Sequence, residues 1–272
     1  MGIASGSDPA KSRLGILGGT GWLGQGLGLN LLRKGLWPAA DLVILNRSGK
    51  AGGYEAHPGV IMARDMAELQ ALCDTIVLSV RPEDFPVPGF APGNRLLISF
   101  MAAVPMDRLV ALAPEARIVR AMPNGGATTG TSYTPWFAEG RAAADIALTR
   151  RILAAMGGED RVESEDHLDI LTAFSGSGPA YPALMARGLL AQALAFGLPQ
   201  PIAERAVAAV VCGSAAGLQV EQAEEVIAAM MSYRGITAAG LQAAQEAGFE
   251  AALAAAMTAA VARARAMGRD EV

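Results

Sequence analysis

The sequence lacks the residues that would build a disulfide framework or a metal site. It has only two cysteines, Cys73 and Cys212, which lie far apart in apolar surroundings, and its two histidines are isolated. We expect both cysteines to be buried free thiols. No metal ion is expected, because neither residue type recurs at the spacing of metal ligands.

The sequence also lacks an excess of positive charge and a long apolar run. Its formal net charge of −4 at pH 7 argues against nucleic acid as a partner. The apolar stretches are broken by Gly, Pro or charged residues before they reach the length of a membrane span. The N-terminal MGIASGSDPAKS has no apolar core of the kind found in signal peptides, so residues 1–11 are predicted to be a flexible tail. We therefore expect a cytoplasmic protein with no membrane partner.

What the chain has in abundance is apolar residues, which make up 52% of its 272 residues, enough for two domains. In the N-terminal half, short apolar runs alternate with helical patterns, as in a doubly wound parallel sheet that is covered on both faces. The predicted strands are residues 13–17, 41–46, 59–63, 75–80, 95–100 and 117–121. Helices are predicted after the first strand, through about residue 34, and over residues 65–71.

From about residue 165 the pattern becomes helical throughout. Ala, Leu and Met recur at helical spacing, and Gly197-Leu198-Pro199 separates two helices. Further helices are predicted over residues 201–218, 221–231 and 238–267. We therefore predict an α/β domain over residues 12–163 and an all-α domain over residues 164–272. The alanine-rich helix faces indicate close helix packing, either within the chain or against a second subunit.

A glycine-rich turn follows the first predicted strand. Its residues Gly19-Thr20-Gly21-Trp22-Leu23-Gly24 read G-x-G-x-x-G between a strand and a helix. Glycine permits the tight turn and lets the backbone approach a pyrophosphate, while the helix N-terminus offers unpaired N–H groups to the phosphates. Although a purely structural turn would have the same letters, this context favours a dinucleotide-binding turn.

The end of the second predicted strand indicates which dinucleotide is bound. Enzymes that use NAD place Asp or Glu about 20 residues beyond the turn, where the carboxylate binds the ribose 2′-hydroxyl. This chain has Asn46-Arg47-Ser48 there. Arginine can pair with a 2′-phosphate, and Asn and Ser can hydrogen-bond to it. We therefore predict NADP(H), the alternative being that Arg47 is an ordinary solvated surface charge.

Two further strand ends are predicted to reach the same ligand. Ser79-Val80-Arg81-Pro82 ends the fourth predicted strand, and Phe100-Met101-Ala102 ends the fifth. Ligands of open parallel sheets bind outside the carboxyl ends of the strands. The small residues and the proline-restricted turn at these ends favour a close approach of the cofactor to the backbone.

Two motifs further along the chain resemble a known family. Met122-Pro123-Asn124 follows the sixth predicted strand, and Ser175-Gly176-Ser177-Gly178-Pro179-Ala180-Tyr181 opens the helical part. Both are similar to motifs of pyrroline-5-carboxylate reductase. Thr237-Ala238-Ala239-Gly240-Leu241 resembles the end of that family's Ser-Pro-Gly-Gly-Thr-Thr-x-x-Gly-Leu stretch. The resemblance covers nearly the whole chain and implies a Rossmann-like domain followed by a helical domain that interleaves with a partner subunit. Together with the alanine-rich helices, it predicts a homodimer or a larger homo-oligomer.

The resemblance also implies an activity and a set of site residues. Members of the family reduce the cyclic imine 1-pyrroline-5-carboxylate to L-proline with NAD(P)H. Cofactor contacts are then expected at residues 19–24, 46–48, 79–82 and 100–102. Substrate contacts are expected at Glu165, Ser232, Arg234, Gly235, Ile236 and Thr237.

The implied reaction requires little of these residues beyond binding and orientation. A protonated imine already carries its activating charge, so the protein has mainly to orient the reactants. Backbone N–H groups at residues 235–237, just before a predicted helix, are suited to a substrate carboxylate. The Thr237 hydroxyl is the candidate catalytic group, since it can hydrogen-bond to the ring nitrogen and deliver its proton. Thr237 also suits a helix N-cap.

The substrate loop departs from the family pattern and leaves alternatives open. Ser232-Tyr233-Arg234-Gly235-Ile236-Thr237 stands where the family has Ser-Pro-Gly-Gly-Thr-Thr. Arg234 either adds a charge-assisted contact to the substrate or points into solvent. The alternatives are a reductase of another cyclic imine acid, such as piperideine- or pyrroline-2-carboxylate, and an NADP-binding protein with little catalytic activity. A β-hydroxyacid dehydrogenase is disfavoured because it relies on a lysine in its second domain, and no lysine follows Lys50.

Overall fold

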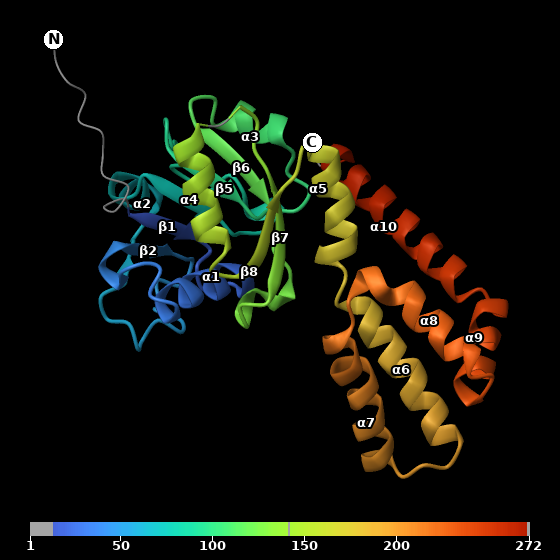
Figure 1. Ribbon diagram of the computed structural model, residues 1–272. Helices are drawn as coiled ribbons and strands as arrows, with labels where there is room; N and C mark the ends of the chain where they lie inside the picture. Colours follow the sequence, from blue (N-terminus) through green and yellow to red (C-terminus); the bar gives the residue numbers. More distant parts are fainter. Residues whose placement is uncertain (1–12, 141, 271–272) are drawn as a thin grey trace. The chain divides into compact units, whose positions relative to one another are not determined.

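The computed structural model of the protein describes residues 13–140 and 142–270 (Figure 1). The predicted tail, residues 1–11, lies outside the described residues. The chain forms two compact units. The first is discontinuous and comprises the residues up to Gly176 together with those from Val261 onward, and the second is Ser177–Ala260. The division falls later than residue 163 because helix α5 (Glu165–Leu171) packs on the sheet of the first unit.

The first unit is built on one eight-stranded sheet with the order β3-β2-β1-β4-β5-β6-β7-β8. The strands from β1 to β6 are mutually parallel, β7 is antiparallel to β6, and β8 is parallel to β7. The order 3-2-1-4-5-6 of the parallel part confirms the Rossmann-like, doubly wound sheet, with its switch point between β1 and β4. The strands are β1 (Leu14–Leu17), β2 (Leu42–Leu45), β3 (Ile61–Met62), β4 (Thr75–Leu78), β5 (Leu96–Ser99), β6 (Arg117–Ala121), β7 (Ser132–Phe137) and β8 (Gly157–Arg161).

Two hydrophobic cores lie on opposite faces of this sheet, because successive residues of a strand point to opposite sides. In β1, Leu14 and Ile16 belong to one core and Leu17 to the other. Helices α1 (Trp22–Arg33) and α4 (Ala143–Leu153) close the first core, whereas α2 (Met66–Leu72) and α3 (Met106–Leu112) close the second. The continuous apolar runs of the predicted strands follow from burial on both faces.

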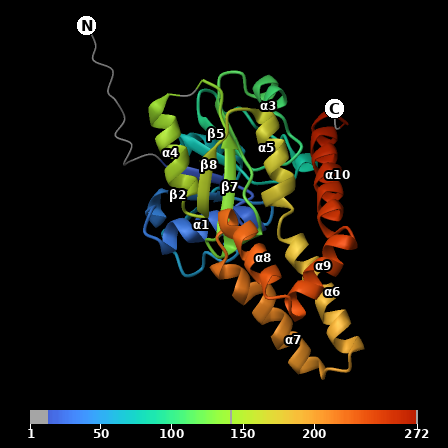
Figure 2. The same ribbon diagram turned by 45° about the vertical axis from the view of Figure 1, so that its right-hand side comes forward.

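The second unit contains helices and no strand among its described residues. Helices α6 (Ala180–Ala195) and α7 (Gln200–Ala208) form a hairpin, followed by α8 (Ala223–Ser232), α9 (Ile236–Glu246) and the long α10 (Phe249–Asp270), which ends within the first unit (Figures 1 and 2). Between residues 177 and 260 only Ala203 and Ala238 are buried. This unit therefore presents most of its apolar side chains on its surface.

Several elements differ from the sequence prediction. Strands β7 and β8 and helices α3 and α4 were not predicted. Strand β7 reads SYTPWF and β8 reads GGEDR, so neither has the continuous apolar run of the predicted strands. The predicted helix over residues 201–218 ends at Ala208 and continues as a π-helical segment, Ala209–Ser214. The prediction that both cysteines are buried is wrong for Cys212, which is exposed in the sparsely buried second unit, whereas Cys73 is buried.

No single helix among the described residues is both long and apolar enough to cross a bilayer. Two strongly bent helix pairs would qualify by length and composition alone.

Candidate functional site

The glycine-rich turn lies where β1 passes into α1, and its shape depends on close backbone contacts. Gly18 has φ +80°, and a Cβ on it would lie 2.2 Å from the backbone oxygen of Ser79 at the end of β4. A Cβ on Gly24 would lie 2.6 Å from the backbone oxygen of Gly18. Only glycine fits such approaches. The turn brings the N-terminus of α1 to the carboxyl ends of β1, β2 and β4.

A pocket of about 700 Å³ opens at these strand ends. It therefore lies at the switch point of the sheet, where open α/β sheets bind ligands. Eight of the residues predicted to bind the cofactor line it: Thr20, Gly21, Asn46, Arg47, Ser48, Ser79, Val80 and Arg81. The structure thus brings together residues from three separate strand ends.

The other predicted cofactor residues do not line this pocket. They are Gly19, Trp22, Leu23, Gly24, Pro82, Phe100, Met101 and Ala102. Phe100 and Met101 are core residues, 4% and 1% exposed, and they pack on opposite faces of the sheet. Their side chains are therefore engaged in the cores, and any cofactor contact there would have to come from the backbone.

Two guanidinium groups stand at the pocket, and an aspartate lies between them. Arg47 Nη1 is 3.5 Å from Asp84 Oδ1, and Arg81 Nε is 3.0 Å from Asp84 Oδ2. Hydrogen bonding and Coulombic attraction from Asp84 raise the pKa of the Arg81 guanidinium, which stays charged. Because the side chains of Arg47 and Arg81 are 84% and 64% exposed, they can turn toward a phosphate.

Asp84 was missed by sequence reasoning. It ends the short 3₁₀ turn Pro82–Asp84 after β4, three residues beyond Arg81, and that spacing was the only available signal. Arg47 follows β2 and Asp84 follows β4, and these two strands lie on either side of β1. Only the sheet order shows that the ends of the two strands are close enough for this contact.

Asn46 and Ser48 shape the loop that carries Arg47. The amide nitrogen of Asn46 donates to the backbone oxygen of Lys50 at 2.9 Å, and the hydroxyl of Ser48 donates to Asn46 Oδ1 at 3.0 Å. These bonds close the loop on itself. They preorganise the position from which Arg47 faces the pocket.

The two motifs that carry the family resemblance meet in the first unit. The side-chain nitrogen of Asn124, after β6, donates to the backbone oxygen of Ser175 at 3.0 Å. Its side-chain oxygen accepts from the backbone nitrogen of Gly126 at 2.9 Å. Asn124 therefore fastens the end of the sheet to the start of the Ser175–Tyr181 motif.

Glu165, predicted to contact substrate, is engaged within the first unit. Its Oε1 forms an ion pair with Arg120 on β6 and accepts from the backbone nitrogen of Met106 at 2.7 Å. Arg120 is also 3.7 Å from Asp169 on α5. These contacts place Glu165 in a partly buried charge cluster with Arg120 and Asp169, and its contact with substrate stays a prediction.

The remaining predicted substrate residues lie in the second unit, around the start of α9. Ser232 ends α8 and donates to the backbone oxygen of Ala229 at 2.7 Å. Arg234 adopts φ +48°, a conformation that favours glycine. The N-cap of α9 is Gly235, so the expectation that Thr237 caps this helix is wrong. Thr237 is exposed in its first turn, and Ile236 before it is 96% exposed.

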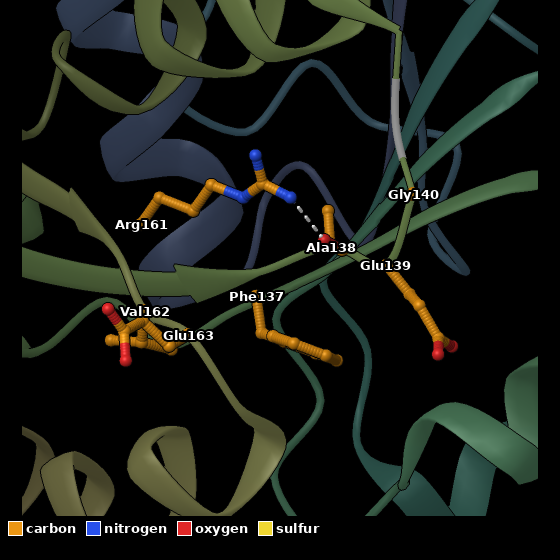
Figure 3. Close-up of a pocket in the computed structure, with 7 residues that line it drawn as sticks. All are labelled: Phe137, Ala138, Glu139, Gly140, Arg161, Val162 and Glu163. Carbon is orange, nitrogen blue, oxygen red and sulfur yellow. Dashed lines mark hydrogen bonds between the residues drawn. The ribbon is translucent and has the colours of Figure 1, made fainter.

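A second pocket, of about 510 Å³, lies where β7 and β8 end (Figure 3). Its lining comprises Phe137, Ala138, Glu139, Gly140, Arg161, Val162 and Glu163. Arg161 reaches across it and donates to the backbone oxygen of Ala138 at 2.7 Å. With its cation engaged and two carboxylates at its rim, this pocket is poorly suited to a phosphate-bearing ligand. Among the described residues, no group of three or more His, Cys, Asp or Glu side chains could hold a metal ion.

The close approach at Gly18 gives a first testable prediction. Gly18→Ala should lower the free energy of unfolding by roughly 2 kcal/mol, because the added methyl meets the backbone and φ is positive. Gly35→Ala is the matched control, since Gly35 has φ +63° and no described atom lies within 4 Å of its Cβ position, and it should cost only about 1 kcal/mol. Chemical denaturation compares the two variants. Equal losses would mean that the contact with Ser79 is not restrictive.

A two-unit oxidoreductase with a dinucleotide-binding sheet is the class that this fold and site define. Comparisons with known proteins agree. Residues 165–267 match the family model described as pyrroline-5-carboxylate reductase dimerisation. A pyrroline-5-carboxylate reductase of Synechocystis is 30% identical over 265 residues, which cover 94% of this chain and 98% of the relative. One of Thermus thermophilus is 30% identical over 230 residues, covering 83% of this chain and 87% of the relative.

Solved structures of the same kind superpose over nearly the whole chain. A pyrroline-5-carboxylate reductase of Coxiella burnetii gives a TM-score of 0.82 at 26% identity, covering 95% of this chain and 99% of that chain. A pyrroline carboxylate reductase of Plasmodium falciparum, solved with NADP bound, gives 0.79 at 25% identity with the same coverage. The protein belongs to the pyrroline-5-carboxylate reductase family, which confirms the resemblance seen in its sequence.

Proposed function

We propose that this protein reduces 1-pyrroline-5-carboxylate to L-proline and uses NADPH as the reductant. The observation that carries the proposal is the pocket at the switch point of the sheet, where the glycine turn and Arg47 come together in a chain of this family. The enzyme is thus an oxidoreductase that acts on a CH–NH bond.

The residues of the pocket fit NADP(H). The N–H groups of the first turn of α1 can bind a pyrophosphate, since the N-cap residue Gly21 has no side chain that would cap them. Arg47 offers a guanidinium to the 2′-phosphate, and no carboxylate follows β2 at residues 46–48. When bound, NADPH supplies the hydride. Arg47 selects it over NADH, and the glycine turn orients it.

The loop before α9 is proposed to hold the substrate. The backbone N–H groups of Gly235, Ile236 and Thr237 stand at the N-terminus of this helix, where they can bind the carboxylate of the imine acid. Arg234 adds a positive charge beside them. The Thr237 hydroxyl hydrogen-bonds to the ring nitrogen, so that the imine stays oriented and protonated. Ser232 supports the loop from the end of α8.

The assembly is proposed to be a homodimer or a larger homo-oligomer in the cytoplasm, with no nucleic acid or membrane partner. The match to a dimerisation domain over residues 165–267 supports a homo-oligomer. The exposed apolar side chains of the second unit, among them Phe196 at 79% and Val220 at 80%, supply the apolar surface that an obligate interface needs. Light scattering at micromolar concentration tests this, and a clean monomer would refute it.

The direct test is NADPH oxidation by the purified protein with 1-pyrroline-5-carboxylate, beside piperideine- and pyrroline-2-carboxylates. Fast turnover of 1-pyrroline-5-carboxylate is expected. Preference for another imine acid would assign the substitutions at Tyr233, Arg234 and Ile236 a role in changing the substrate. Tight NADPH binding without turnover of any imine would instead make the protein a binding protein.

Thr237 can be tested by a pair of substitutions. Thr237→Ala should lower kcat roughly tenfold, since one hydrogen bond to the reacting ring is lost while the backbone N–H groups remain. Thr237→Ser, which retains the hydroxyl, should keep most of the activity. Steady-state kinetics with saturating NADPH measures both. An alanine variant with wild-type kcat would remove Thr237 from the mechanism.

A further inference from the structure

The connection between β2 and β3 is unusual for a parallel pair of strands. Such strands are normally joined by a crossover that contains an α-helix. Here residues 46–60, all of them described, form turns and no helix. This crossover begins with the loop that carries Arg47, so whatever holds the crossover in place also holds the predicted 2′-phosphate site.

Tyr54 is the buried residue of this crossover. It is 2% exposed and belongs to the same core as Leu27 and Leu31 of α1. Its hydroxyl donates to the backbone oxygen of Gly19, in the glycine turn, at 3.0 Å. Burial raises the pKa of Tyr54, so the phenol remains a hydrogen-bond donor at physiological pH. Tyr54 therefore links the crossover directly to the turn that faces the pyrophosphate.

Its neighbours in the crossover pack against the same region. A Cβ on Gly52 would lie 2.8 Å from Thr20 Cγ2, and a Cβ on Gly53 would lie 2.3 Å from Gln25 Nε2, which donates to the backbone oxygen of Gly52. The three consecutive residues Gly52, Gly53 and Tyr54 thus lie against the glycine turn and α1.

Helix α1 is shaped to receive the tyrosine. A Cβ on Gly28 would lie 2.1 Å from the Tyr54 hydroxyl oxygen, so only glycine at this position leaves room for it. Gly49, Gly52 and Gly53 all have positive φ, and glycine is the residue with the most conformational freedom to lose. Without an anchor, ordering this segment around a ligand would carry a large entropic cost.

We propose that Tyr54 is a positioning residue for the 2′-phosphate site: its hydrogen bond to Gly19 holds the helix-free crossover, and with it Arg47, against the glycine turn. The inference rests on the proposed use of NADPH. The glycine turn itself has further support, because Gly18 N donates to Leu45 O at 2.8 Å and Gly21 N donates to Gly18 O at 2.9 Å. Loss of the Tyr54 hydroxyl therefore loosens the Arg47 loop more than the turn.

The test is the binding of NADPH and of NADH to the purified full-length protein, measured by calorimetry for the wild type, Tyr54→Phe and Tyr133→Phe. Tyr54→Phe keeps the ring in the core and removes only the hydroxyl, so NADPH should bind roughly fivefold more weakly while NADH binding changes little. Tyr133→Phe is the control, because it removes a hydroxyl on β7 outside the pocket, and it should leave both affinities unchanged.

A second variant approaches the same contact from the helix. Gly28→Ala displaces the Tyr54 hydroxyl and should reproduce the selective loss of NADPH affinity, and thermal unfolding checks that each variant is folded. If Tyr54→Phe weakens the binding of NADPH and NADH equally, or leaves both affinities unchanged, this inference is overturned and the proposed function is not. A wild-type protein that fails to bind NADPH would overturn the proposed function and this inference with it.

Discussion

Replacing Arg47 with alanine should raise the KM for NADPH by roughly 10- to 100-fold, the equivalent of losing charge-assisted hydrogen bonds to a phosphate. The KM for NADH should change little, because NADH has no 2′-phosphate. The side chain is 84% exposed, and the ion pair that it forms among the described residues, with Asp84 at 3.5 Å, is long, so the substitution costs the fold little. Steady-state kinetics with each nucleotide at a fixed imine concentration gives the ratio of the two effects.

Arg64→Ala is the matched control for Arg47→Ala. Arg64 is equally exposed, at 82%, and pairs with Glu68, but it does not line the pocket. It should leave both KM values unchanged. An Arg47→Ala enzyme that still prefers NADPH by the wild-type ratio would show that the 2′-phosphate is selected elsewhere, and Arg81 would be the next candidate.

The parts of the cofactor site that sequence reasoning located are those that local chemistry dictates. The G-x-G-x-x-G turn has to contain glycine because a Cβ at Gly18 or Gly24 would collide with backbone. The apolar runs of β1, β2, β4 and β5 are buried on both faces, so their positions follow from composition alone. Strand ends could therefore be read from the sequence, and residues 46–48 and 79–81 do line one pocket.

What sequence reasoning missed depends on partners that lie far apart in the chain. Strand β8 reads GGEDR and has no apolar pattern, yet it pairs with β7 over its whole length. Tyr54 lies in a glycine-rich stretch that looks like an ordinary loop, and its burial in the core depends on the space that Gly28 of α1 leaves for it. Asp84 contacts Arg47 because β2 and β4 are both neighbours of β1 in the sheet, and the sequence does not show that order.

Glu165 has a role in the structure that the sequence did not indicate. The family resemblance predicts that it contacts substrate, and in the structure its carboxylate accepts from Met106 N and pairs with Arg120. A carboxylate at a family motif position can bind substrate, or it can balance the charge of a buried arginine. The sequence motif is the same in both cases. The contacts of Glu165 therefore add a structural role, and its predicted contact with substrate stays a prediction.

Arg120 is the centre of that charge cluster, and its removal should be the most damaging change to stability. Its side chain is 4% exposed, and Glu165 and Asp169 are 30% and 27% exposed. Its Nε is buried without a hydrogen-bond partner among the described residues, so the guanidinium is stabilised mainly by the two carboxylates. Arg120→Leu fills part of the space but removes the guanidinium with which both Glu165 and Asp169 pair. We expect a loss of roughly 3 kcal/mol in the free energy of unfolding at neutral pH, measured by chemical denaturation.

The pH dependence of that loss separates charge from packing. Burial raises the pKa of Asp169, and Arg120 partly opposes the rise. A carboxyl whose pKa is raised on folding stabilises the fold when protonated, and that contribution disappears as the pH rises through the raised pKa. Without Arg120 the pKa of Asp169 rises further, so the loss of unfolding free energy in Arg120→Leu should shrink from neutral to mildly acidic pH.

Adding Glu165→Gln and Asp169→Asn to Arg120→Leu should recover part of the stability at neutral pH and abolish the pH dependence. A deficit that stays the same at both pH values and in the triple variant would mean that the cluster contributes through packing, because a cavity has no charge to titrate.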